Sequence, residues 1–306
     1  MKTRYIIRLT FLTGLLLCAR LHAQIYVANS GSGNSSIVEY NLNGTPVGSG
    51  TLVPASLGLN APVGIAISGT DIFVTNNGGN SINEYTTSGA VVGTGTLVAG
   101  LLNLGGIAVS GTDLYVAYNG TIAEYTTSGS LVASTSLFAN NPTGVAVSGS
   151  NLLVTNYNNN TISEYSTAGL TASGTLAATG MIQPIGIAVS GSLVLVANNG
   201  NDTITEYTTS GSMVGSGTLV TASSGLVDPL GIAISGSDFY VTTGSNKTID
   251  EFSLADGSPV GTGTLVSTGL HGPYGIVVVP EPSTWAMLAM GGAGLLMALR
   301  RGIKAA

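Results

Sequence analysis

The stretch GIAVSGTDLYVAYNGTIAEYTTSG, residues 106–129, is one copy of a unit that returns about every forty residues along the chain. The start of the unit occurs six times, as GIAIS at Gly64, GIAVS at Gly106, GVAVS at Gly144, GIAVS at Gly186, GIAIS at Gly231 and GIVVV at Gly275. An acidic residue followed by an aromatic one also occurs six times, at Glu39-Tyr40, Glu84-Tyr85, Glu124-Tyr125, Glu164-Tyr165, Glu206-Tyr207 and Glu251-Phe252. Two independent landmarks therefore give the same count of units.

Each unit is predicted to form four short strands. In the quoted copy these are Gly106–Ser110, Leu114–Ala117 and Thr121–Tyr125, and the fourth is clearest in another copy, at Val92–Val98. Gly and Asp in the segment Ser110–Asp113 suit a tight turn between the first two strands. A period near forty with four strands per copy and no helical periodicity is typical of a β-propeller blade.

The two ends of the repeat region are incomplete units. The region begins with the second-strand pattern at Ile25–Asn29 and ends with the first-strand pattern at Gly275–Val279. Together they complete one blade, so a ring closed by strands from both ends leaves no open edge at the closure. The sequence therefore predicts an all-β, six-bladed propeller over residues 24–279.

The N-terminus has the three parts of a secretory signal peptide. Residues 1–23 combine a basic start, an apolar run over Leu9–Ala19 and a small residue, Ala23, at which a signal peptidase would cut before Gln24. The apolar run is too short for a good membrane span. Cys18 offers a lipoprotein signal as an alternative. Either signal predicts that the propeller is exported.

The predicted propeller is strongly acidic. Residues 24–279 contain thirteen acidic residues and a single basic one, Lys247, which gives a net charge of −12. Such a surface repels phosphate backbones, so we expect no nucleic-acid partner. The only cysteine, Cys18, lies in the signal segment, so the exported part has neither a disulfide nor a thiol nucleophile.

One glutamate recurs in the third strand of every unit. The six residues are Glu39, Glu84, Glu124, Glu164, Glu206 and Glu251. Because side chains alternate along a strand, this Glu shares a face with the Ile two positions earlier, and the aromatic residue takes the other face. One hypothesis is a ring of carboxylates that lines a channel or holds a cation. We favour a structural role, because a residue present in every blade serves what all blades share.

The loops after the second strands are rich in asparagine and glycine, as in Asn76–Asn80, Asn156–Asn160 and Asn198–Asp202. These residues tolerate left-handed backbone and form side-chain turns. Calcium binding is the alternative, but calcium prefers several carboxylates and these loops offer mostly amides. We therefore expect no cofactor and no catalytic or metal-binding residue, with calcium as the open alternative.

The quoted unit resembles the NHL and YVTN-type propeller repeats, and Ile204–Tyr207 also resembles repeats of the virginiamycin B lyase group. The NHL-like resemblance covers residues 24–279 and implies the propeller fold. Enzymes of the lyase group need a catalytic His and a metal, whereas the only His outside the signal segment is His271, in a predicted turn. Gluconolactonase-like propellers hold a divalent cation with Glu, Asn and Asp, and no such set can be placed on particular positions here.

The C-terminal segment, residues 280–306, resembles the PEP-CTERM sorting signal that exosortases recognise. It contains in order the triplet Pro280, Glu281 and Pro282, an apolar span at 284–299, and the basic residues Arg300 and Arg301. Sixteen residues form a helix of about 24 Å, slightly short of a typical hydrocarbon core. The basic end would stay in the cytoplasm and the propeller outside.

These observations predict an exported propeller that its tail anchors in the inner membrane and that is then cut near the Pro-Glu-Pro triplet. The resemblance implies delivery to the cell surface or the extracellular matrix, with signal peptidase and an exosortase as processing partners. We expect a non-enzymatic binding or structural module, for exopolysaccharide or matrix proteins. The alternative is a metal-dependent lyase or lactonase that acts on an exported substrate.

Overall fold

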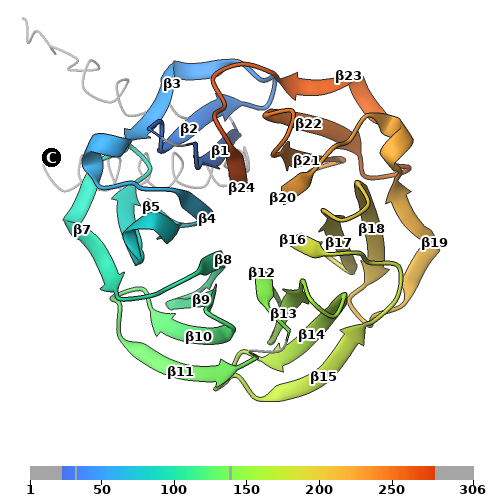
Figure 1. Ribbon diagram of the computed structural model, residues 1–306, viewed down its shortest axis with the longest axis horizontal. Helices are drawn as coiled ribbons and strands as arrows, with labels where there is room; N and C mark the ends of the chain where they lie inside the picture. Colours follow the sequence, from blue (N-terminus) through green and yellow to red (C-terminus); the bar gives the residue numbers. More distant parts are fainter. Residues whose placement is uncertain (1–22, 32, 138–139, 280–306) are drawn as a thin grey trace, which may run out of the picture. The chain divides into compact units, whose positions relative to one another are not determined.

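The computed structural model describes residues 23–31, 33–137 and 140–279, and residues 25–279 form one compact unit. The described chain forms twenty-four strands in six four-stranded sheets, which surround a central axis as blades (Figure 1). The expected all-β, six-bladed propeller is therefore confirmed.

The strands follow the predicted order in every blade, from the axis outward. Blade 1 contains β24 (Pro273–Val279), β1 (Gln24–Asn29), β2 (Ser36–Asn41) and β3 (Pro46–Pro54). Blade 2 contains β4 (Pro62–Ser68), β5 (Asp71–Asn76), β6 (Ser81–Thr86) and β7 (Val91–Ala99), and blade 3 contains β8 (Leu104–Ser110), β9 (Asp113–Tyr118), β10 (Thr121–Thr126) and β11 (Leu131–Ser136). Blade 4 contains β12 (Pro142–Ser148), β13 (Asn151–Asn156), β14 (Thr161–Ser166) and β15 (Ala172–Ala177). Blade 5 contains β16 (Pro184–Ser190), β17 (Leu193–Asn198), β18 (Thr203–Thr208) and β19 (Met213–Val220), and blade 6 contains β20 (Pro229–Ser235), β21 (Asp238–Thr243), β22 (Thr248–Ser253) and β23 (Pro259–Val266).

Blade 1 closes the ring as the sequence predicts. Its innermost strand β24 comes from the C-terminal end of the repeat region and lies beside β1 from the N-terminal end (Figure 1). The N–H of Ser30 donates to the carbonyl of Gly272 at 2.7 Å, next to this pairing. A sheet shared by both ends of the repeat region holds the first and last units together.

At most of its six positions the repeated glycine of the first strand is required, because the inner strands approach each other closely. A Cβ at Gly144 would lie 2.2 Å from the carbonyl oxygen of Ile185 in the next blade, and one at Gly186 would lie 2.3 Å from that of Leu230. Both distances are far below a normal contact, so only glycine permits this spacing. The motif GIAVS therefore sets the radius of the ring.

Threonine on the second strand links neighbouring blades in half of the ring. In blade 4 the N–H of Gly144 donates to Thr155 Oγ1 at 2.8 Å, and this hydroxyl donates to the carbonyl of Ile185 in blade 5 at 2.8 Å. Thr75 and Thr242 make the same bridge in blades 2 and 6. Blades 1, 3 and 5 have alanine at this position, namely Ala28, Ala117 and Ala197. Threonine and alanine thus alternate around the ring.

The third strands are buried on both faces, which explains their pattern. Ile122 packs against blade 4, in a cluster with Val145 and Tyr165, while Tyr125 packs against blade 2, in a cluster with Phe73. Each blade therefore presents its Ile and Glu to the following blade and its aromatic residue to the preceding one.

The predicted signal peptide (1–23, apart from Ala23) and the predicted membrane helix (284–299) lie outside the described residues. Ala23 is buried, and Gln24 opens β1. Over the part of the chain that the structure describes, no helix has the length and apolarity that crossing a bilayer requires.

Candidate functional site

The central channel is narrow, and most of its lining side chains are apolar. The space along the axis has a volume of about 80 Å³ and is lined by Gly and aliphatic residues of the six inner strands, together with Thr143 and Tyr274. None of the repeated glutamates is among the residues that line it. No Asp, Glu, His, Lys or Arg belongs to the described lining of the channel.

Tyr274 is the one large polar residue of the channel lining. It occupies the inner strand of the closing blade, at the position where the other blades carry Val63, Gly105, Thr143, Ile185 or Leu230. Burial, together with smaller contributions from the nearby Asp228 and Tyr157, raises the pKa of Tyr274 to about 12. Its phenol is therefore neutral at physiological pH and belongs to the packing of the channel.

The six repeated glutamates lie on the third strands, separated from the axis by the first and second strands of their blades. Glu39, Glu124 and Glu206 are buried, and the other three are partly buried. Asn151 Nδ2 donates to Glu164 Oε1 at 2.6 Å within blade 4. Each blade contributes one of the six carboxylates, and each carboxylate lies between its own blade and a neighbouring one.

Burial governs the titration of these glutamates. Burial raises the pKa of Glu206. Burial and the negative charge of Asp113 both raise the pKa of Glu124. The hydroxyl of Tyr115 and the backbone N–H of Gly169 donate to Glu124 and partly offset this increase. The same combination of burial and a neighbouring aspartate raises the pKa of Glu84 and Glu251.

The asparagine-rich loops lie on one face of the disc, with the linkers that enter the inner strands. Their side chains bind neighbouring loops: Asn159 Nδ2 donates to Asn140 Oδ1 at 3.2 Å, and Asn160 Oδ1 accepts the N–H of Gln183 at 2.7 Å. Several of these residues, including Asn80 and Asp202, have left-handed backbone. The described residues contain no group of three His, Cys, Asp or Glu that could hold a metal ion.

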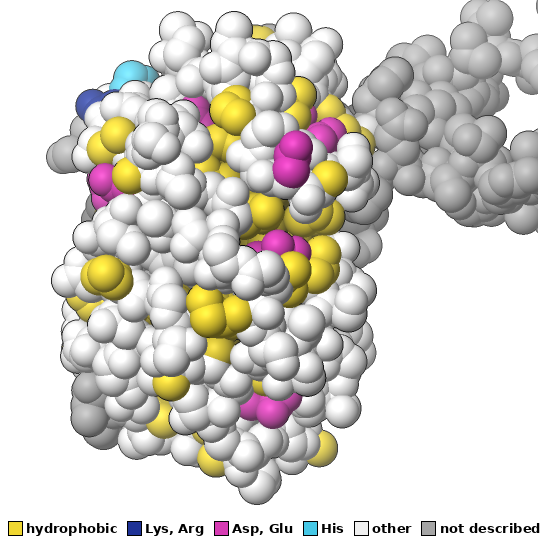
Figure 2. Space-filling view, turned by 90° about the vertical axis from the view of Figure 1, so that its right-hand side faces the viewer, with side chains coloured by type: hydrophobic (Ala, Val, Ile, Leu, Met, Phe, Trp, Pro, Cys, Tyr) yellow, Lys and Arg dark blue, Asp and Glu magenta, His cyan; other side chains and the backbone are white. Residues whose placement is uncertain are grey.

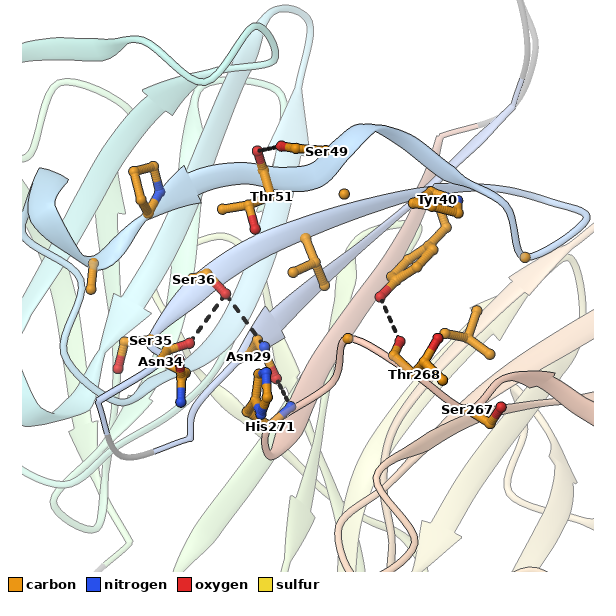
Figure 3. Close-up of a pocket in the computed structure, with 18 of the residues that line it drawn as sticks. Asn29, Asn34, Ser35, Ser36, Tyr40, Ser49, Thr51, Ser267, Thr268 and His271 are labelled. Atoms are coloured by element: carbon orange, nitrogen blue, oxygen red, sulfur yellow. Dashed lines mark hydrogen bonds between the residues drawn. The ribbon is translucent and has the colours of Figure 1, made fainter.

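A cavity lies at the ring closure, between blade 1 and the linker 267–272. It has a volume of about 660 Å³, within the range of small-molecule sites, and Figure 3 shows its lining. Its walls come from β2, β3, the hairpin between β1 and β2, and the end of blade 6. The lining therefore combines segments from both ends of the repeat region.

The floor of this closing-blade cavity is apolar and its rim is polar. Val38, Tyr40 and Val266 are nearly fully buried, and the Tyr40 hydroxyl donates to the carbonyl of Thr268 at 3.3 Å (Figure 3). Hydroxyls and amides surround them, from Asn29, Asn34, Ser35, Ser36, Ser49, Thr51, Ser56 and Ser267. No Asp, Glu, Lys or Arg belongs to the described lining.

His271 lies on the rim of the cavity and is exposed. Its backbone N–H donates to Asn29 Oδ1 at 2.7 Å, and Asn29 Nδ2 donates to Ser36 Oγ at 3.4 Å (Figure 3). Asn29 therefore ties the linker to the hairpin of blade 1. No carboxylate lies in the described lining to orient the imidazole as a general base.

The linker into blade 1 differs from the linkers into blades 2 and 6. The linkers at 55–61 and 221–228 each contain a 3-10 turn, η1 (Ala55–Leu57) and η3 (Ala222–Ser224). In blade 2 the carbonyl of Leu57 in this turn accepts the Tyr85 hydroxyl at 3.0 Å, so the turn lies against the third strand. The linker 267–272 forms no such turn, and the third strand of blade 1 keeps open space in front of it.

The outcomes for the predicted site residues differ. His271 is near a cavity, the glutamates lie between blades, and the sorting residues Pro280, Glu281, Pro282, Arg300 and Arg301 lie outside the described residues. The cavity residues Ser36, Tyr40 and Thr268 were not predicted. The available signal was the predicted ring closure, which places the segments 25–40 and 265–275 side by side.

Comparison with known proteins identifies the C-terminal segment. Residues 278–301 match the PEP-CTERM protein-sorting motif, which confirms the resemblance seen in the sequence. No curated protein matches the chain. The motif implies a protein that is exported and processed by an exosortase.

Solved structures support the fold. A chain in the crystal structure of the nidogen/laminin complex is 18% identical, with a TM-score of 0.70 over 85% of this chain and 99% of that chain. A computationally designed protein, Ika8, is 12% identical, with a TM-score of 0.50 over 77% of this chain and 69% of that chain. Identities this low show a common fold and nothing about ligands.

Proposed function

We propose that this protein is an exosortase-processed propeller of the cell surface or extracellular matrix that binds a neutral glycan, such as an exopolysaccharide segment, in the closing-blade cavity. The observation that carries the proposal is the lining of that cavity. It combines a buried apolar floor with many hydroxyl and amide groups and, in its described part, without a carboxylate or a cation.

This chemistry suits an uncharged, hydroxyl-rich ligand. Neutral donors and acceptors satisfy sugar hydroxyls without the desolvation cost of a buried charge. Figure 2 shows that one side of the molecule is mostly neutral, with scattered carboxylates and few basic groups. The net charge of −12 on residues 24–279 disfavours acidic polysaccharides.

A binding role agrees with the chemistry of the cavity better than glycan cleavage does. Glycosidases use a pair of carboxyl groups beside the scissile bond, and the described cavity lining contains none. The second candidate, a metal-dependent lyase or lactonase, would need a metal site. Titration with calcium therefore separates the two proposals.

Binding is tested with residues 23–279, which contain all six sheets, on an array of neutral and acidic glycans. Thr51→Trp places a large ring on β3 at the cavity and should abolish binding. Thr218→Trp is the matched control, because it makes the same change at the same repeat position of β19, also exposed, in blade 5. Equal binding by both variants would contradict the proposed site, and binding of acidic glycans alone would contradict the proposed ligand.

The sorting step is tested in the full chain. Replacing Pro280, Glu281 and Pro282 with alanine should leave export intact and prevent processing, so the unprocessed chain accumulates in the membrane fraction. Unchanged processing and unchanged location would show that this triplet does not direct sorting.

A further inference from the structure

The outer strands of the propeller protect their open edges with glycine rather than with charge. Four of them share the pattern Gly-Ser/Thr-Gly-Thr-Leu-Val, in β3, β7, β19 and β23, and none of these strands contains a charged residue. In β7 the pair Gly93 and Gly95 has φ values of 54° and 82°, and the other three strands have the same left-handed pairs. Their pairing with the third strands shifts register twice. Such irregular edges cannot readily accept another strand.

Strand β11 of blade 3 lacks this protection. Ala133 and Thr135 occupy the two glycine positions, and no residue of Leu131–Ser136 has a positive φ. Four consecutive residues of β11 pair in register with 121–124 of β10, with a single shift before the hairpin turn. Since the ladder bonds of an antiparallel pair alternate, every second residue of β11 keeps its N–H and C=O directed away from β10.

The same strand carries the two most exposed large apolar side chains of the described surface. Leu131 is 59% exposed and Val132 is 53% exposed, and the strand has no charged residue, no proline and no glycine. Extended backbone, free ladder groups and an adjacent apolar pair are the features that favour addition of a strand at a sheet edge. Figure 1 shows β11 on the outer perimeter of the ring.

We propose that β11 pairs antiparallel with β11 of a second copy of this chain, joining two propellers edge to edge through blade 3. In a dimer with a two-fold axis, β11 of each copy pairs with β11 of the other copy. One contact then covers both open edges, because each strand contributes both N–H donors and C=O acceptors. Pairing of β11 with β3, β7, β19 or β23 is blocked by their left-handed glycines. The remaining outer strand, β15, is irregular too, because Gly174 has a φ of 133° and its pairing with β14 shifts register twice. The association therefore ends at a dimer.

The contact is weak in dilute solution. A ladder of six residues buries less surface than the roughly 1,200 Å² of a stable interface, and two copies of net charge −12 repel each other. Because β11 contains no charged residue, its edge adds no local charge repulsion when a second acidic copy approaches. Pairing is significant where copies are concentrated, as on a surface to which one sorting motif delivers them all.

Cross-linking tests the pairing, because residues 24–279 contain no cysteine. Ser134→Cys in β11 and Ser216→Cys in β19 introduce one thiol each at the same repeat position of two edges. With a short bismaleimide and a concentration series, we expect the Ser134→Cys variant to form cross-linked dimer roughly tenfold faster than the Ser216→Cys variant. Equal rates for the two variants would overturn the proposal.

A second variant restores the protected pattern. Ala133→Gly combined with Thr135→Gly gives blade 3 the glycine spacing that four other outer strands already have. In the Ser134→Cys background this change should reduce the cross-linking rate to that of the Ser216→Cys control, while circular dichroism and melting show a folded propeller. An unchanged cross-linking rate would show that β11 does not pair as an extended strand.

Discussion

Gly144→Ala tests whether glycine on the inner strands sets the radius of the ring. A Cβ at this position would lie 2.2 Å from the carbonyl oxygen of Ile185, about 1 Å short of the closest approach that a methyl group normally makes. The oxygen is backbone and belongs to the next inner strand, so relief requires that a whole blade moves. We expect an overpacking cost of about 3 kcal/mol.

Gly106→Ala is the matched control at the same repeat position. Its Cβ would lie 3.0 Å from the carbonyl oxygen of Thr143, so a shift of a few tenths of an ångström suffices. Both variants gain about 0.4–1 kcal/mol because alanine restricts the unfolded chain. The control should therefore cost about 1 kcal/mol or less.

Thermal unfolding of residues 23–279 distinguishes the two variants. The net cost of Gly144→Ala is therefore about 2–2.6 kcal/mol. For a domain of this size each kcal/mol lowers Tm by about 2–4 °C, so Gly144→Ala should melt about 4–10 °C lower and Gly106→Ala within about 4 °C of the parent. Equal shifts, or a larger loss for Gly106→Ala, would refute the argument that strand spacing at the axis requires glycine.

Three further predictions concern stability. Thr155→Ala removes the hydroxyl that links Gly144 to Ile185 and should cost about 1–3 kcal/mol, measured by urea unfolding; a smaller loss would mean that water replaces the bridge. Burial raises the pKa of Glu206, so its protonated form stabilises the fold below the unfolded pKa near 4.5, and this contribution is lost as pH rises through the folded value. Glu206→Gln should therefore raise Tm more at pH 7 than at pH 4, and the opposite order would contradict the direction of the shift. Adding calcium or EDTA should leave Tm unchanged, whereas an increase of several degrees at micromolar calcium would support the metal-dependent alternative.

The sequence predicts the fold well because the repeat is itself the structural constraint. Glycine at the axis, Ile and an aromatic residue on opposite faces of the third strand, and Gly-Asp turns each specify a local geometry, and six copies make the assignment redundant. The pairing of β24 with β1 followed from counting incomplete units.

The closing-blade cavity could not be predicted for a physical reason. The 3-10 turns occur in linkers with eight residues between the last valine of the outer strand and the proline of the next inner strand, at 54–61 and 221–228, whereas 267–272 has only six. The sequence shows this shorter linker, but not that the space in front of the third strand stays open. Tyr40 illustrates the limit, because the sequence places it on the correct face yet does not show that its hydroxyl meets Thr268 beside an open space.

The two proposed contacts lie in different blades and reinforce each other. The cavity belongs to blade 1 and β11 to blade 3, so a dimer through β11 leaves both cavities accessible (Figure 1). Two linked sites on one polymer can raise the apparent affinity by about 10²–10⁴ without any new contact. The variant with Ala133→Gly and Thr135→Gly should therefore bind an immobilised polysaccharide much more weakly than the parent, and a short soluble oligosaccharide equally well. Equal loss on both ligands would mean that the edge contributes to the binding site itself, and no loss on either would mean that the dimer plays no part in retention.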